Sequence, residues 1–366
     1  MKGVRGPALI PVDPTTWNTH FRVRPLLKWA GGKRQLLPVL REYYPDDFQR
    51  YVEPFFGSGA VFFDLYSAGR LVERHVRLTD NNPDLVGCYR TLRDSPEAVI
   101  AALESLAEGH RGRGARFFYE VRDRRFNPTR AAGHGTYTPE LAAMLIYLNR
   151  TGFNGLFRLN RRGEFNVPMG RYKNPRICDA DHLRDVARAL GGDRISIEHG
   201  SFEQSLADVG SGDFVYCDPP YAPLSRTACF AQYTAGGFNT IDQQRLQQAV
   251  IAAAERGAIV VLSNSSAPEI AELYRSAAAQ RAGLHVRPVP ARRAINSRPS
   301  RRGPVDELIV TNARRVKLAT LPPRATMARA GLRAREKKKV YAPGSQTSVR
   351  QLGHAKASRR SETKDT

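Results

Sequence analysis

The sequence of 366 residues has few cysteines and no long apolar run. Its four cysteines are scattered and contain no CxxC pair, so the sequence predicts neither a zinc site nor a disulfide framework. No stretch of about 20 apolar residues occurs, which argues against a transmembrane helix. The N-terminal stretch "MKGVRGPALIPVDPTTW" lacks the apolar segment of a secretory signal. These absences predict a protein of the cytosol or the nucleoid.

Acidic residues are scarce beside basic ones. The chain has 57 Lys and Arg against 35 Asp and Glu, a net charge of +22 and a pI of about 10.3. Such a charge indicates a polyanionic partner, most often nucleic acid. Residues 314–366 hold 15 Lys and Arg and three Asp and Glu, which is +12 of the +22. This tail has few large apolar residues, so we predict that 316–366 is disordered and either attaches to DNA non-specifically or merely solubilises the chain.

Strand-like and helix-like segments alternate in residues 21–95 and again in 191–315. This alternation predicts an α/β domain with a mostly parallel, twisted sheet. Residues 96–190 differ, because they are rich in arginine and aromatic residues and contain predicted helices at "SPEAVIAALESLA" and "PELAAMLIYLNR". We therefore expect a mainly helical lobe inserted into the α/β domain, with an irregular leader at 1–20.

Three informative turns, "EPFFGSG", "TDNN" and "DPPY", each follow a predicted strand. Parallel sheets bind ligands beyond the carboxyl ends of their strands, so we expect the turns to meet at one crevice. Gly57 and Gly59 allow the backbone to approach a ligand closely, and the Asp80 carboxylate suits the hydroxyls of a ribose. The alternatives are a plain tight turn and an Asp80 that caps the following helix.

The segment "PLLKWAGGKRQLL" has Gly31 and Gly32 in a loop flanked by Lys28, Trp29 and Lys33. Either lysine would attract a carboxylate or a phosphate group. The alternative is a surface loop with a half-buried tryptophan.

The stretch "DFVYCDPPY" ends an apolar run in Asp218, Pro219, Pro220 and Tyr221. The prolines stop the strand and fix the backbone, and because proline supplies no N–H group, the corner presents hydrogen-bond acceptors. Asp218 and the Pro219 carbonyl would each accept one hydrogen of an exocyclic amine such as that of adenine, while Tyr221 stacks on the base. The alternative is a proline-rich turn with a capping aspartate and a core tyrosine.

Basic and aromatic residues alternate in "YLNRTGFNGLFRLNRRGEFNVPMGRYKNP". Such residues contact phosphates and guanine edges, meet thymine methyl groups or wedge between bases. A second basic segment, "PARRAINSRPSRRG", suggests phosphate contacts. The alternatives are a solvated basic loop and an exposed hairpin with ordinary surface charge.

These segments occur in one order over about residues 26–312 and resemble the Dam-type DNA adenine-N6 methyltransferases. "DPPY" is shared with other amine methylases, whereas "KWAGGK" together with "FNGLFR" and "RGEFNVPMGRY" is far more specific. The resemblance implies S-adenosyl-L-methionine as the cofactor and no metal. It also implies a Rossmann-like catalytic domain at 21–95 and 191–315, with a target-recognition lobe at 96–190.

The resemblance assigns roles at matching positions. The implied cofactor-binding residues are Trp29, Lys33, Phe55, Gly57, Gly59, Asp80 and Asp218. The implied catalytic residues are Asp218, Pro219, Pro220 and Tyr221. The implied DNA-binding residues are Lys28, Phe153, Asn154, Leu156, Arg158, Pro168, Arg171 and Tyr172. Phe153, which is tyrosine in the close Dam pattern, is implied to insert into the duplex, and "FRLN" departs from the family's "CRYN".

We expect a monomeric, nucleoid-associated enzyme of the cytoplasm that methylates the N6 amine of a flipped adenine in duplex DNA, within GATC. The rivals are an adenine methylase for another sequence or for RNA, a protein glutamine methylase, and a non-catalytic DNA-binding protein. The RNA and glutamine methylases usually carry a motif that begins with Asn and lack "RGEFNVPMGRY". Intact Asp218, Tyr221, Gly57 and Asp80 argue against the non-catalytic protein.

Overall fold

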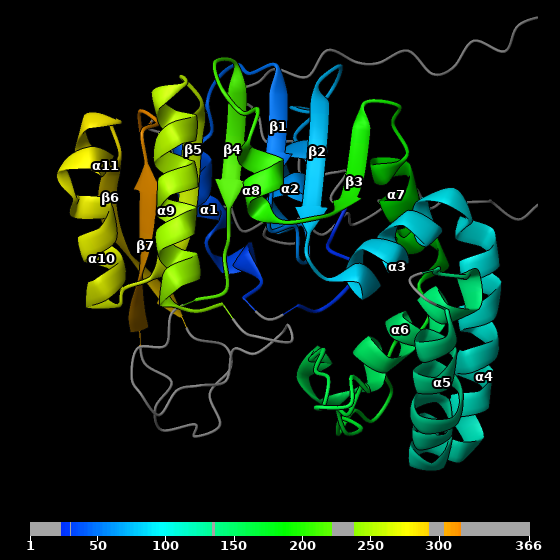
Figure 1. Ribbon diagram of the computed structural model, residues 1–366. Coiled ribbons are helices and arrows are strands. Elements are labelled where there is room, and N and C mark those ends of the chain that lie inside the picture. The colour runs from blue at the N-terminus through cyan, green and yellow to red at the C-terminus, as the bar shows by residue number, and fades with distance from the viewer. Residues whose placement is uncertain (1–22, 30, 134–135, 222–237, 293–303, 316–366) are drawn as a thin grey trace, which may run out of the picture. The chain divides into compact units, whose positions relative to one another are not determined.

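The computed structural model describes residues 23–29, 31–133, 136–221, 238–292 and 304–315 (Figure 1). The described residues all belong to one unit of the chain, Met1–Leu318. The predicted leader at 1–20 and basic tail at 316–366 lie outside the described residues, as does most of the second basic segment.

Within the described residues, seven strands form one sheet in the order β3-β2-β1-β4-β5-β7-β6 (Figure 1). They are β1 (Arg50–Glu53), β2 (His75–Asp80), β3 (Ile195–His199), β4 (Asp213–Cys217), β5 (Ile259–Ser265), β6 (His285–Arg292) and β7 (Pro304–Thr311). The neighbours from β3 to β5 pair in parallel, and β7 runs antiparallel to both β5 and β6. The predicted Rossmann-like fold with a mostly parallel sheet is confirmed.

The order of the strands reverses at β1. The chain leaves β1 for β2 on one side and returns through β4 on the other, and Val52 of β1 is in register with Arg77 of β2 and Val215 of β4. This reversal is a topological switch point, where parallel α/β sheets bind their ligands. The turns after β1, β2 and β4 therefore lie at one edge of the sheet.

Helices cover both faces of the sheet (Figure 1). On one face lie α1 (Leu37–Leu40) and α2 (Ala60–Ser67), and on the other lie α8 (Phe202–Leu206), α9 (Thr240–Glu255) and α10 (Pro268–Arg275). Alternate side chains of β4 point to opposite faces, so Phe214 and Tyr216 join one hydrophobic cluster and Val215 and Cys217 the other. This double burial explains the continuous apolar run before "DPPY".

Further helices extend the first cluster, and the first of them packs against β2 and β3. They are α3 (Pro83–Asp94), α4 (Pro96–Tyr119), the π-helix η3 (Glu120–Phe126), α5 (Asn127–Ala132), α6 (Pro139–Thr151) and α7 (Ala180–Leu190). The predicted helices at "SPEAVIAALESLA" and "PELAAMLIYLNR" are thus confirmed as α4 and α6. Leu141 to Asn149 of α6 are all buried, and one uninterrupted cluster joins them to the sheet. A short α11 (Ala277–Arg281) precedes β6.

The segment after α6 folds back on itself, and we call residues 152–173 the hairpin. Isolated bridges join Gly152 to Met169 and Leu159 to Phe165. The Asn127 side chain holds the hairpin to α5, because its Nδ2 donates to the Phe165 carbonyl at 3.0 Å and its Oδ1 accepts from the Phe165 N–H at 2.8 Å. The basic and aromatic segment predicted to meet nucleic acid is therefore an ordered structure.

Candidate active site

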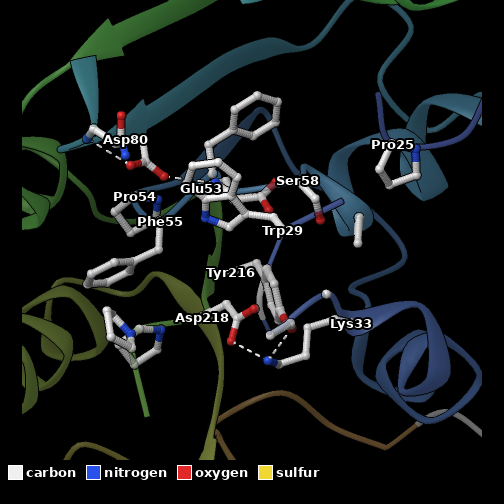
Figure 2. A pocket seen from close by; sticks show the side chains of 18 of the residues that line it. Pro25, Trp29, Lys33, Glu53, Pro54, Phe55, Ser58, Asp80, Tyr216 and Asp218 are labelled. Atoms are coloured by element: carbon white, nitrogen blue, oxygen red, sulfur yellow. Dashed lines mark hydrogen bonds and ion pairs between the residues drawn. The ribbon is translucent and has the colours of Figure 1, made fainter. Parts of the chain in front are cut away.

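A cavity of about 890 Å³ opens at the carboxyl ends of β1, β2 and β4 (Figure 2). The three turns singled out in the sequence meet there, together with the loop around Trp29. The predicted site residues that line it are Lys28, Trp29, Lys33, Phe55, Gly57, Asp80, Asp218, Pro219, Pro220 and Tyr221. Gly59 lies between two lining residues, Ser58 and Ala60.

The turn after β1 requires its two glycines. Gly57 and Gly59 have φ angles of 49° and 68°, in the left-handed region that other residues rarely adopt. A Cβ on Gly59 would lie 2.4 Å from the Phe56 ring, and one on Gly57 would lie 3.2 Å from Cδ1 of Trp29. The turn is therefore narrow, and its second glycine is needed for packing as much as for access to a ligand.

Asp80 organises the turns after β1 and β2. Its Oδ2 accepts a hydrogen bond from the Gly57 N–H at 2.8 Å, and its Oδ1 accepts from the Asn82 N–H at 2.9 Å. Burial raises the pKa of this carboxyl to about 6, against the lowering effect of the backbone hydrogen bonds. The cap of α3 is Asn82, whose Oδ1 accepts from two backbone N–H groups, so the alternative that Asp80 caps this helix is wrong.

Asp218 faces a buried lysine (Figure 2). Lys33 Nζ lies 2.7 Å from Asp218 Oδ1 and donates to the Gly31 carbonyl at 2.7 Å. The Ser263 hydroxyl donates to the same Asp218 oxygen at 3.2 Å. Burial raises the pKa of Asp218 to about 6, while Lys33 lowers it and Glu307 raises it further. The carboxylate is thus held in one orientation, and its charge is balanced by Lys33.

Side chains from other parts of the chain hold Pro220 and Tyr221 of the corner in place. The Tyr221 hydroxyl donates to Glu307 Oε2 at 2.6 Å, and Lys33 Nζ lies 4.2 Å from the centroid of the Tyr221 ring. Gln243 donates from Nε2 to the Pro220 carbonyl at 3.0 Å, and Asn264 donates to Gln243 at 3.0 Å. Because Gln243 and Asn264 are buried, these contacts stabilise the backbone of the corner in a single conformation.

Sequence reasoning missed several residues that line the cavity or support the corner. Glu53 ends β1, is only 2% exposed, and accepts a hydrogen bond from the Tyr51 hydroxyl at 2.8 Å. Burial raises the pKa of Glu53 well above its usual value. A glutamate within an apolar strand, directly before the glycine turn, was a signal that the sequence offered. For Glu307 and Gln243 no such signal existed, because both are far from the corner in the chain.

Aromatic side chains form the apolar walls. The Trp29 ring stacks on Phe157 with centroids 5.6 Å apart. Phe55 stacks on Phe202 at 5.4 Å and meets Phe238 edge-on at 5.8 Å. Between these walls and the two acids, the cavity suits a ligand with a flat ring and hydrogen-bonding groups.

The predicted DNA-binding residues lie on the hairpin, except Lys28, which the fold brings beside it. Phe153 is 47% exposed, unusual for a large apolar residue, and Asn154 next to it has a φ of 55°. Arg158 is exposed and donates from Nε to Asn166 at 2.8 Å. Pro168 and Arg171 are exposed, and Tyr172 lies 3.4 Å from Lys28 Nζ. Leu156 is half-buried against the core.

The described residues offer little for other kinds of site. Cys88 and Cys217 are buried, and burial raises the pKa of both thiols. Within the described ranges, no group of three or more His, Cys, Asp and Glu side chains has the arrangement of a metal site. Among the helices of those ranges, none has the length and apolar character that a membrane span needs.

Comparisons with known proteins show the family of the chain. Residues 29–287 match the family model for D12 class N6 adenine-specific DNA methyltransferases. A type II methyltransferase of Lactococcus lactis subsp. cremoris is 37% identical over 296 residues, which cover 80% of this chain and 96% of the relative. A type II methyltransferase of Methanocaldococcus jannaschii is 37% identical over 303 residues, with 80% and 100% covered.

The DNA adenine methylase of Escherichia coli (strain K12) is 36% identical over 286 residues, which cover 78% of this chain and 94% of the relative. The resemblance to the Dam-type enzymes is thereby confirmed. The family argues against the alternatives of an RNA methylase, a protein glutamine methylase and a non-catalytic DNA-binding protein. The chain belongs to the D12 class of N6 adenine-specific DNA methyltransferases and is an adenine-specific DNA-methylating enzyme.

Proposed function

We propose that the protein transfers the methyl group of S-adenosyl-L-methionine to N6 of an adenine flipped out of duplex DNA, within the sequence GATC. One observation carries the proposal. The acceptor-rich corner at Asp218 and the turn at Asp80 open into the same cavity, beside a hairpin of basic and aromatic residues. A base and a nucleoside cofactor would therefore meet at the switch point of the sheet.

The cavity fits the cofactor. Asp80 offers carboxylate oxygens for the ribose hydroxyls, Phe55 and Trp29 offer flat apolar walls for the adenine ring, and Lys33 offers an ammonium group for the amino acid carboxylate. The volume of about 890 Å³ lies in the range of small-molecule sites, roughly 300–1,000 Å³. When bound, the cofactor supplies an electrophilic methyl group on a sulfonium, which leaves as a neutral thioether.

The corner then acts on the target base. Asp218 accepts one hydrogen of the exocyclic amine and the Pro219 carbonyl accepts the other, which frees the nitrogen lone pair for attack. Tyr221, oriented by Glu307, stacks on the ring. With a pKa of about 6, Asp218 is mostly ionised at neutral pH and is matched to take up the amine proton after transfer.

The hairpin is the part of the protein that we propose recognises the DNA sequence. Phe153 fills the space that the flipped base leaves, which with stacking on Tyr221 offsets a flipping cost of a few kcal/mol. Asn166 orients Arg158, whose guanidinium suits the two acceptors of a guanine edge. Leu156, Pro168, Tyr172 and Lys28 contact further bases, and Asn154 and Arg171 complete the DNA-binding set.

The same proposal extends to the organisation of the chain. Residues 96–190 form the target-recognition lobe, and 21–95 with 191–315 form the catalytic domain. Because one chain supplies every residue of the site, we infer that a monomer acts on DNA. A DNA substrate places the enzyme at the nucleoid, in the cytoplasm.

Sequencing that detects N6-methyladenine in DNA from a host without its own adenine methylase tests the proposal. Cells that express the protein should show methyladenine in GATC, and cells that express Asp218→Ala should show none. Methylation centred on another sequence would refute the GATC assignment and leave the reaction standing. Methylation that persists in the Asp218→Ala variant would refute the assigned chemistry.

A further inference from the structure

Two consecutive residues, Lys28 and Trp29, line the cavity and also contact the hairpin. Lys28 Nζ lies 3.4 Å from the Tyr172 hydroxyl oxygen of the hairpin and 4.5 Å from the centroid of that ring. Trp29 forms a wall of the cavity, where it packs against Gly57 and stacks on Phe157. A single peptide thus joins a side chain that lies beside the hairpin to a side chain that shapes the cavity.

Asn149, near the end of α6, holds this peptide in place. Its Oδ1 accepts from the Lys28 N–H at 2.9 Å, and its Nδ2 donates to the Lys28 carbonyl at 2.8 Å. The same Nδ2 donates to the Gly155 carbonyl of the hairpin at 2.8 Å. Asn149 is only 2% exposed, so this amide binds the loop and the hairpin together away from solvent.

Direct contact strengthens the connection. Gly155 has a φ of 65°, and a Cβ on it would lie 2.5 Å from Cβ of Lys28, so the Gly155 backbone packs directly against the Lys28 side chain. Arg150, which follows Asn149, donates from Nη2 to the Leu26 carbonyl at 3.2 Å. The end of α6 thus holds residues 26–28 through two consecutive side chains, and this loop cannot shift without disturbing the hairpin.

We propose that Asn149 is a positioning residue that couples the hairpin to the cofactor cavity, so that DNA and cofactor each tighten the binding of the other. The inference rests on the proposed function, in which Lys28 contacts DNA and Trp29 contacts S-adenosyl-L-methionine. DNA that engages Lys28 restrains the peptide that carries Trp29. The cofactor then meets a wall that is already ordered, so the protein loses less conformational entropy when the cofactor binds.

The coupling must be reciprocal, because the two binding equilibria form a thermodynamic cycle. It is measured as the ratio of two dissociation constants of S-adenosylhomocysteine, without and with a saturating GATC duplex, by calorimetry on the full chain. S-adenosylhomocysteine carries no methyl group to transfer, so no turnover occurs. In the wild type we expect a ratio of about 5–150.

Asn149→Ala should bring this ratio to within about twofold of one, the value for uncoupled sites. Asn127→Ala is the matched control, because Asn127 also makes two hydrogen bonds to the hairpin backbone, but to Phe165 and not to Lys28. The control should weaken DNA binding and keep the wild-type ratio. A merely structural role of Asn149 would change affinities or thermal stability without this selective loss.

Circular dichroism shows whether Asn149→Ala folds. If it does not fold, the coupling is tested with Phe157→Leu instead. This variant removes the stacking partner of Trp29 and should also lower the ratio of the two dissociation constants. A wild-type ratio of one overturns the inference, and so does an unchanged ratio in the deciding variant. If the wild type binds neither S-adenosylhomocysteine nor DNA, the proposed function itself has failed.

Discussion

The ion pair between Lys33 and Asp218 makes a quantitative prediction for the variant Lys33→Met. An opposite charge within hydrogen-bonding distance lowers the pKa of a carboxyl group by about 1–3 units. Without the Lys33 ammonium, which lies 2.7 Å from Asp218 Oδ1, the pKa of Asp218 should therefore rise from about 6 to about 7–9. At pH 7.5 the ionised fraction would fall from roughly 97% to between about 76% and 3%.

The direction of the pH dependence follows from which protonation state of Asp218 is active. The ionised carboxylate accepts the amine hydrogen, so activity is lost as the pH falls through the pKa of Asp218. The acidic limb of kcat/KM against pH, measured with duplex DNA from about pH 5 to pH 10, reports this pKa in the free enzyme. Its midpoint should lie near 6 in the wild type and one to three units higher, by the same approximate range, in Lys33→Met.

Lys33 also faces the proposed cofactor site, so the variant is expected to lose activity at every pH. Such a loss lowers the whole profile without moving its midpoint, which separates the two effects. Lys33→Arg keeps the positive charge and should keep the midpoint near that of the wild type. An acidic limb that stays in place in Lys33→Met would refute the reasoning that Lys33 sets the charge state of Asp218.

Three further predictions concern stability, base flipping and the tail. Gly59→Ala should lower the free energy of unfolding by about 1–3 kcal/mol in a denaturant titration, because its φ is 68° and its Cβ would meet the Phe56 ring. The control is Gly112→Ala, in open space on α4, which should raise the free energy of unfolding by about 0.5–1 kcal/mol. Equal effects of the two substitutions would contradict this account. Phe153→Ala should weaken the flipped state by about 1–3 kcal/mol, seen as lower fluorescence of 2-aminopurine at the target position, whereas Phe153→Tyr should retain the signal; full signal in the alanine variant would exclude insertion. Deleting residues 316–366 should reduce the salt dependence of DNA binding and preserve the sequence choice, and a loss of sequence choice would make the tail part of recognition.

The local signals in the sequence were reliable where backbone chemistry is local. Prolines after an apolar run mark the end of β4, and glycines mark the turn after β1. Proline restricts the backbone and glycine frees it wherever they occur in a chain. The strand β6, which contains Pro288 and Pro290, residues that rarely occur inside a sheet, was not singled out in the sequence. β6 lies at the edge of the sheet, where a missing N–H is tolerated.

The role of Asp80 shows the limit of local reading. Both ribose binding and helix capping were consistent with an acid after a strand, and the sequence could not choose between them. The structure shows that Asn82 caps α3, while Asp80 accepts the N–H of Gly57, 23 positions earlier. A contact between two neighbouring turns depends on strand order, which no short motif contains.

By itself, the sequence determined the class of reaction through its resemblance to the Dam-type enzymes, and it indicated a corner of hydrogen-bond acceptors because proline supplies no N–H group. It also determined the α/β class through its alternating pattern. Only the tertiary structure decided which groups support that corner. Glu307 reaches Tyr221 across 86 positions and Asn149 reaches Lys28 across 121, because the packing of the sheet and of α6 brings these segments together. The charge of Asp218 and the connection between hairpin and cavity both depend on such contacts, whose strength is set by distance in space and not by spacing along the chain.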